Sequence, residues 1–223
     1  MASALVPPPA PALRRCDDLA AILREALIFE KDSSMNEEHL LRQTRRLLEC
    51  LDEGGIPHVL VGGLALLQYV DVRNTRDINL ILATEDLPRL PGFVLREKNE
   101  WFATGDCGPL RVDLLPTANP FFAKVATKHS GPRRFLDTTL HCCTPEGIIL
   151  LKLYALPSLY RQGSITRADL YETDILQLLR LDTVTDDSLI AQLRPHVSDT
   201  DLKALAAVLT DIRGRLASQK RFA

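Results

Sequence analysis

The pattern of apolar and polar positions is most informative between residues 58 and 82, where short apolar runs alternate with glycine and polar residues. This stretch predicts, in order, a strand over 58–61, a turn at Gly62 and Gly63, a short helix over 64–70, a polar turn over 73–76 and a strand over 77–82. Side chains alternate along a strand, so Asp77 and Asn79 should share one face of the second strand. Ile78 and Leu80 should share the other.

The same two periods continue along the rest of the chain. Helical spacing predicts helices near Leu19 to Leu27 and over about 36–52, 146–156, 168–181, 187–194 and 198–217. Short apolar runs between turn residues predict strands over 93–95, 101–104, 110–115 and 135–142, with a short helix or turn over 84–90. Two further segments are interpreted as a mobile apolar stretch over a cleft (119–128) and a basic loop (129–134). Together these elements predict an α/β fold.

Composition defines the class of protein. The chain has 223 residues, 46% hydrophobic and 25% charged, which is ordinary for a globular protein with a substantial core. The formal net charge of −2 gives no general electrostatic case for nucleic-acid binding. Three arginines on the helix over 36–52 could contact RNA or phosphate, although a solvated face is the favoured interpretation: Arg42, Arg45 and Arg46.

Several features favour a cytoplasmic protein without a membrane partner. No apolar run approaches the roughly 20 residues that a membrane-spanning helix needs. The Pro-rich residues 1–12 predict a disordered tail and have no charged start or apolar core of a signal peptide. The five cysteines lack a C-x-x-C spacing, so we expect reduced and mostly buried thiols.

The stretch from 58 to 82 also carries candidate chemistry. A glycine pair after a strand lets a phosphate approach the backbone, and the helix that follows directs N–H groups at the anion. Asp77 and Asn79 place two oxygen-bearing side chains on one strand face, which suits Mg²⁺. The alternative for Gly62 and Gly63 is a turn that only permits tight packing.

Two more polar residues interrupt apolar elements. Asp113 lies in the centre of the strand over 110–115, where a carboxylate is costly unless it is paired or binds a metal. A structural salt bridge with an arginine is the alternative to a metal. Lys152 interrupts the apolar helix over 146–156, and its alternative is a surface lysine whose stem lies along apolar residues.

These residues resemble the motifs of the nucleotidyltransferase superfamily of the DNA polymerase β type. The sequence Gly-Gly-Leu-Ala at 62–65 followed by Arg-Asn-Thr-Arg-Asp-Ile-Asn-Leu at 73–80 is most similar to the AbiEii-like and minimal nucleotidyltransferase branch, which includes many toxin–antitoxin enzymes. In that family the glycines hold the triphosphate and two Asp separated by one residue bind metals. Asp77 matches the first Asp, and Asn79 stands where the second is expected.

The resemblance extends over about residues 55–181. It implies that Asp113 is the third carboxylate of a cation site formed with Asp77 and Asn79, and that Lys152 contacts the nucleotide phosphates. Asp174 matches the acid of a later helix motif, with Asp169 and Glu172 as nearby alternatives. The implied catalytic residues are therefore Asp77, Asp113 and Lys152, and the implied nucleotide-binding residues are Gly62, Gly63, Lys152 and Asp174.

The implied architecture is a mixed sheet with flanking helices. A nucleotidyltransferase-like α/β domain with N-terminal helices would span residues 13–142, and a helical C-terminal portion would span 143–223. The first functional hypothesis is transfer of a nucleotidyl group from an NTP to a hydroxyl of RNA or protein, assisted by Mg²⁺ or Mn²⁺, with a possible antitoxin partner. The second is a nucleotide-binding or protein-interaction module without turnover. Asn79 favours the second hypothesis, because an amide carries no charge to hold a divalent cation.

Overall fold

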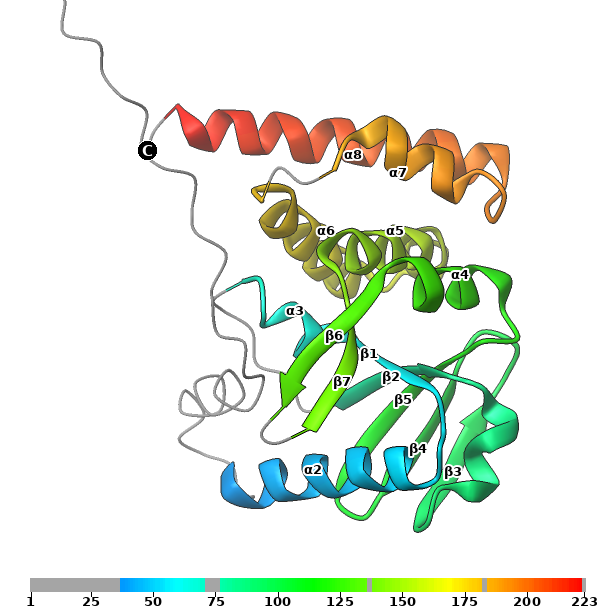
Figure 1. Cartoon of the computed structure of the whole chain (residues 1–223). Helices are drawn as coiled ribbons and strands as arrows, with labels where there is room; N and C mark the ends of the chain where they lie inside the picture. Colours follow the sequence, from blue (N-terminus) through cyan, green and yellow to red (C-terminus); the bar gives the residue numbers. More distant parts are fainter. Residues whose placement is uncertain (1–36, 71–76, 136–137, 182–183, 222–223) are drawn as a thin grey trace, which may run out of the picture.

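A seven-stranded sheet forms the centre of the computed structural model, which describes residues 37–70, 77–135, 138–181 and 184–221 (Figure 1). Its strand order is β3-β4-β5-β2-β1-β7-β6. The strands are β1 (His58–Val61), β2 (Asp77–Leu82), β3 (Phe93–Lys98), β4 (Ala103–Cys107), β5 (Leu110–Pro116), β6 (Ser130–Phe135) and β7 (Thr138–Cys143). The pairs β2–β5 and β1–β7 are parallel and the other pairs are antiparallel. The mixed sheet confirms the predicted fold class.

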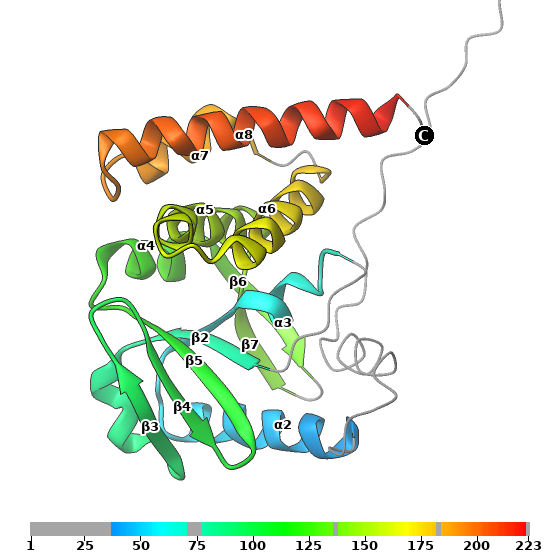
Figure 2. The same cartoon turned by 180° about the vertical axis from the view of Figure 1, so that it is seen from behind.

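Helices cover both faces of this sheet (Figures 1 and 2). Helix α2 (Glu37–Glu53) lies on one side, and α5 (Pro145–Arg161) and α6 (Ile165–Leu179) lie on the other. Helices α7 (Asp186–Leu193) and α8 (Asp199–Lys220) form an outer layer over α5 and α6. The shorter elements are α3 (Gly62–Leu66), η1 (Thr84–Arg89) and α4 (Pro120–Lys128).

Local sequence explains where α4 and α5 begin. The Thr144 hydroxyl accepts a hydrogen bond from the Gly147 amide at 3.2 Å, and Pro145 occupies the first turn of α5, as its sequence predicts. The Asn119 side chain accepts from the Phe121 amide at 2.9 Å in the same way. These caps fix the start of α4 and α5 against the sheet.

Two segments differ from the sequence-based expectation. Residues 119–128 are the capped helix α4 rather than a mobile stretch, because Phe121 and Val125 on one side of it are fully buried. Residues 129–134 are largely strand β6 rather than a basic loop, and this strand pairs antiparallel with β7. Gly131 and Pro132 favoured a loop in the sequence-based prediction. The strand forms nevertheless, because β6 lies at the edge of the sheet, where proline is tolerated.

Other expectations fall outside the described residues or agree with the structure. The tail, the helix near Leu19 and the polar turn over 73–76 lie outside the described ranges. The cysteines within those ranges are free thiols; Cys142 and Cys143 are buried, and burial raises the pKa of Cys142 to about 12. None of the helices in the described ranges has both the length and the apolar character needed to cross a membrane.

Candidate functional site

The pairing of β2 with β5 and of β5 with β4 gathers polar side chains on one face of the sheet. Asp77 lies opposite Arg111, and Asn79 lies opposite Asp113 in the parallel pair. Thr104 and Asp106 of β4 lie opposite Asp113 and Arg111 in turn. Residues opposite one another in a sheet project from the same face, so these six side chains form two adjacent rows.

The Asn79 side chain lies against the turn at Gly62. Gly62 has a φ of 67°, and a Cβ at this position would lie 1.7 Å from the Asn79 Oδ1 atom. Two features therefore disfavour a side chain at Gly62: its left-handed backbone conformation and the close approach of Asn79. Gly62 begins α3, so the predicted glycine turn and the predicted second ligand position are in direct contact.

Asp113 has an arginine partner in this structure. The Arg111 Nε lies 3.2 Å from the Asp113 Oδ1, and the Arg111 side chain is 60% exposed. The hydrogen bond to Asp113 and the negative charge of that carboxylate raise the pKa of Arg111 further above its usual value. The salt bridge that was the alternative interpretation of Asp113 is thus present, at a half-buried position that solvent can reach.

The donor atoms on this face fit Mg²⁺ by their chemistry. Asp77, Asn79 and Asp113 offer carboxylate and amide oxygens, which are the hard ligands that Mg²⁺ prefers. Within the described ranges, no group of three or more His, Cys, Asp or Glu side chains could hold a metal ion. A cation here would therefore depend on the neutral Asn79 oxygen as its third protein ligand and would compete with Arg111 for Asp113.

Lys152 and Asp174 form a second group between α5 and α6. The Lys152 Nζ lies 2.7 Å from the Asp174 Oδ2, and the two side chains are each 7% exposed. The same ammonium lies 4.1 Å from the centre of the Tyr171 ring. The surface-lysine alternative is therefore wrong, and Asp174 rather than Asp169 or Glu172 is the acid that reaches Lys152. A phosphate contact by Lys152 stays a prediction, and it would have to be shared with Asp174.

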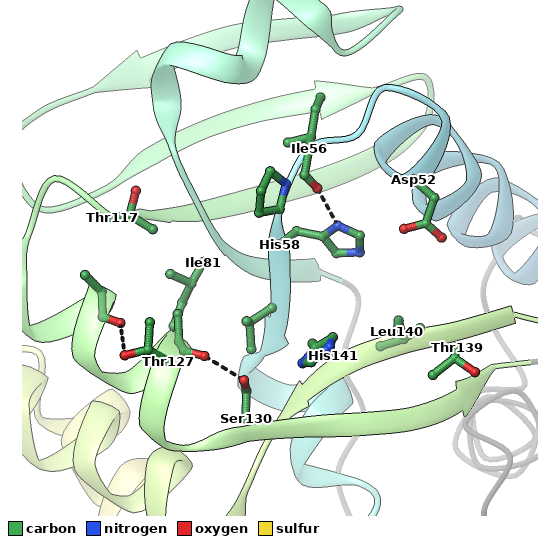
Figure 3. A pocket seen from close by; sticks show the side chains of 14 residues that line it. Asp52, Ile56, His58, Ile81, Thr117, Thr127, Ser130, Thr139, Leu140 and His141 are labelled. Atoms are coloured by element: carbon green, nitrogen blue, oxygen red, sulfur yellow. Dashed lines mark hydrogen bonds between the residues drawn. The ribbon is translucent and has the colours of Figure 1, made fainter.

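Another hollow in the described part of the chain lies away from these residues. A cavity of about 520 Å³ opens between the start of β1, the end of α4 and β7 (Figure 3). Asp52, His58 and His141 line it, and the His58 Nδ1–H donates to the Ile56 carbonyl at 2.9 Å. None of the predicted site residues lines this cavity, so the candidate site is defined by its chemistry and not by its depth.

Sequence reasoning missed Arg111 as a member of the site. The signal was present, because Arg111 lies two residues before Asp113 in a strand and must share its face. Asp106 and its ion-pair partner Arg96 of β3 extend the same polar face outward. The strand of Arg96 was predicted three residues too short (93–95) and the strand of Asp106 was predicted too early (101–104), so neither residue was placed in a strand beside Asp113.

Comparisons with known proteins support the fold. No protein-family model and no curated protein sequence matches the chain. An antigenic nucleotidyltransferase-like protein from Paracoccidioides brasiliensis is similar in structure, with a TM-score of 0.56 and 18% sequence identity over 81% of this chain and 91% of that chain. The chain therefore shares the fold of that nucleotidyltransferase-like protein.

A second protein is similar at a lower score. The antibiotic-resistance factor ANT(2'')-Ia gives a TM-score of 0.47 and 17% identity over 82% of this chain and 97% of that chain. Its complex with adenylyl-2''-tobramycin gives 0.48 and 16% identity over 78% and 97%.

The contact between Gly62 and Asn79 can be measured with a matched glycine. Gly163 has the same φ of 67°, but a Cβ there would meet nothing within 4 Å. Gly163→Ala should lower the free energy of unfolding by about 1–2 kcal/mol, the usual cost of a side chain in the left-handed region. Gly62→Ala should cost more in urea denaturation. Asn79→Ala in the same chain should recover only part of the difference, because it removes the Oδ1 and Cγ atoms of Asn79 but keeps its Cβ, 2.7 Å from the added Cβ. Equal losses at the two glycines would contradict the contact.

The buried pair of Lys152 and Asp174 predicts strong coupling in a double-mutant cycle. Lys152→Met leaves a buried carboxylate without this cation and should cost about 3–5 kcal/mol of unfolding free energy. Lys152→Met with Asp174→Leu should cost less than Lys152→Met alone, because no buried charge is left behind.

An exposed pair in the same helical region provides the control. Arg161 is 64% exposed and pairs with Asp201 at 2.8 Å. Arg161→Met should cost less than about 1 kcal/mol in the same denaturation experiment. Additive losses for Lys152 and Asp174, or equal losses for Arg161 and Lys152, would show that the buried pair is not coupled as described.

Proposed function

We propose that this protein binds a nucleoside triphosphate with Mg²⁺ or Mn²⁺ on the polar face of β2 and β5 and transfers a nucleotidyl group to a hydroxyl of RNA or protein. One observation carries the proposal. Asp77, Asn79 and Asp113 share a sheet face, and Asn79 touches the Gly62 turn. A glycine turn next to hard oxygen donors supports the proposal, because phosphate binding and cation binding must occur side by side in such a site.

Each residue has a physical role in this proposal. Gly62 and Gly63 let phosphate oxygens approach the backbone at the start of α3. Asp77, Asn79 and Asp113 would hold the cation, which when bound neutralises phosphate charge and lowers the pKa of an attacking hydroxyl. Lys152 would add a charge-assisted contact to a phosphate oxygen while it remains paired with Asp174.

A second candidate function is a nucleotide-binding or protein-interaction module without turnover. Two observations favour it: Asn79 brings no negative charge, and the Asp113 carboxylate is already paired with Arg111. Both reduce the attraction of this face for a divalent cation. A place in a toxin–antitoxin pair, with a cytoplasmic antitoxin protein as partner, follows from the AbiEii-like motifs and belongs to either candidate.

The binding site is tested with one carboxylate of the site and one outside it. Asp77→Ala should abolish Mg²⁺-dependent binding of a nucleoside triphosphate in calorimetry, because it removes one of the two carboxylates assigned to the cation. Asp201→Ala is the matched control, since it removes a half-buried carboxylate of α8 that is paired with Arg161 in the helical layer. Circular dichroism should show both variants folded. Unchanged affinity in folded Asp77→Ala, or an equal loss in Asp201→Ala, would contradict the assignment.

Turnover separates the two candidate functions. Wild-type protein that binds nucleotide and transfers radiolabel from an NTP to total RNA or to protein is a transferase. Wild-type protein that binds with Mg²⁺ or Mn²⁺ and transfers nothing is the module.

A further inference from the structure

Arg111 occupies the centre of the polar face. In the sheet it lies opposite Asp77 of β2 on one side and Asp106 of β4 on the other, and its Nε contacts Asp113 at 3.2 Å. Asp106 has its own partner in Arg96 of the neighbouring strand. Arg111 therefore brings its positive charge to Asp77 and Asp113, the two carboxylates that the proposed function assigns to a cation.

The position of Arg111 also leaves it open to a ligand. Its side chain is 60% exposed, although it contacts Asp113. It lines an open groove on this face together with Arg96, Glu97, Thr104 and Asp106. The guanidinium carries five N–H donors, and the described contact with Asp113 uses only Nε, so its terminal nitrogens can still donate to an anion in the groove.

The charges of the site are consistent with one divalent cation in place of two. Nucleotidyl-transfer sites commonly hold two divalent cations, which stabilise the attacking and the leaving oxygen. Three carboxylates with two such cations carry a net charge of +1. Asp77, Asp113 and Arg111 with a single cation, and with Asn79 neutral, also carry +1. Relative to a site with three carboxylates and two cations, the neutral Asn79 removes one negative charge and Arg111 adds one positive charge. Together they balance the loss of one divalent cation.

We propose that Arg111 replaces one divalent cation in this site and binds a phosphate oxygen of the nucleotide directly, so that the nucleotide is held with a single Mg²⁺. This inference rests on the proposed function of the site. Arginine suits the role because its planar fork matches phosphate oxygens and its charge persists at every physiological pH. Asp113 acts as the positioning residue that orients the guanidinium.

The inference is tested by counting bound cations. The probes are Mn²⁺ and the α,β-methylene analogues of ATP, GTP, CTP and UTP, which resist transfer. Free Mn²⁺ is followed by electron paramagnetic resonance, and bound analogue is measured by equilibrium dialysis. Wild-type protein should hold one Mn²⁺ per bound analogue. Arg111→Gln should weaken the analogue at saturating Mn²⁺ by about tenfold or more, the value of a lost charge-assisted contact.

Two further variants test the cation count and provide a control. Asn79→Asp combined with Arg111→Gln restores a third carboxylate and removes the competing cation, so it should hold two Mn²⁺ per analogue. Arg161→Gln is the matched control, because Arg161 is 64% exposed and paired with an Asp far from this face. It should behave like wild type in both measurements. Circular dichroism of all three proteins should show an unchanged fold.

The outcomes distinguish this inference from the proposed function. Wild-type protein with two Mn²⁺ per analogue, or Arg111→Gln with unchanged affinity, would overturn the role of Arg111 while nucleotide binding stands. A fall in affinity equal to that of Arg161→Gln would overturn it as well. Failure of every analogue to bind wild-type protein would overturn the proposed function and this inference together.

Discussion

The parallel pairing of β2 with β5 is the constraint on which the candidate site depends. Its register sets Asn79 opposite Asp113 and Asp77 opposite Arg111. A slip of one residue would move these polar groups to the opposite face, where Leu80 and Leu114 are completely buried. The buried leucines therefore fix the register, and the register in turn fixes the chemistry. The same register of β2 against β5 therefore determines both the packing of the core and the geometry of the site.

The glycine turn and the helical portion extend this arrangement in two directions. β1 pairs with β2 so that Val61 lies opposite Asn79, which brings the Gly62 turn directly against the Asn79 amide. On the other side of the turn, α5 and α6 are held together by the buried pair of Lys152 and Asp174. A buried pair of this kind contributes little net stability, and we expect its main effect to be on how the two helices face one another.

The sequence identified the elements of the site better than their partners. The strands 58–61 and 77–82 were predicted at their observed bounds, because Gly62 marks the end of the first and the polar residues 73–76 mark the start of the second. The pairing of Lys152 with Asp174 could not be predicted, because it depends on how α5 packs on α6. The same holds for α4, whose apolar residues indicate burial but not the surface that buries them. The partner of Asp113 is Arg111, two residues away in the same strand. The sequence indicated an arginine salt bridge as the alternative to a metal, but it did not indicate which arginine.

The central claim is that a nucleotide binds on the face shared by Gly62, Asn79 and Asp113. Amide chemical shifts of labelled protein, measured by NMR while Mg²⁺ and a non-hydrolysable nucleoside triphosphate are added, test this claim most directly. The account predicts that the largest shifts fall at Gly62 and Gly63 and within β2 and β5. Largest shifts at His58, Leu140 and His141, around the cavity of Figure 3, would contradict it.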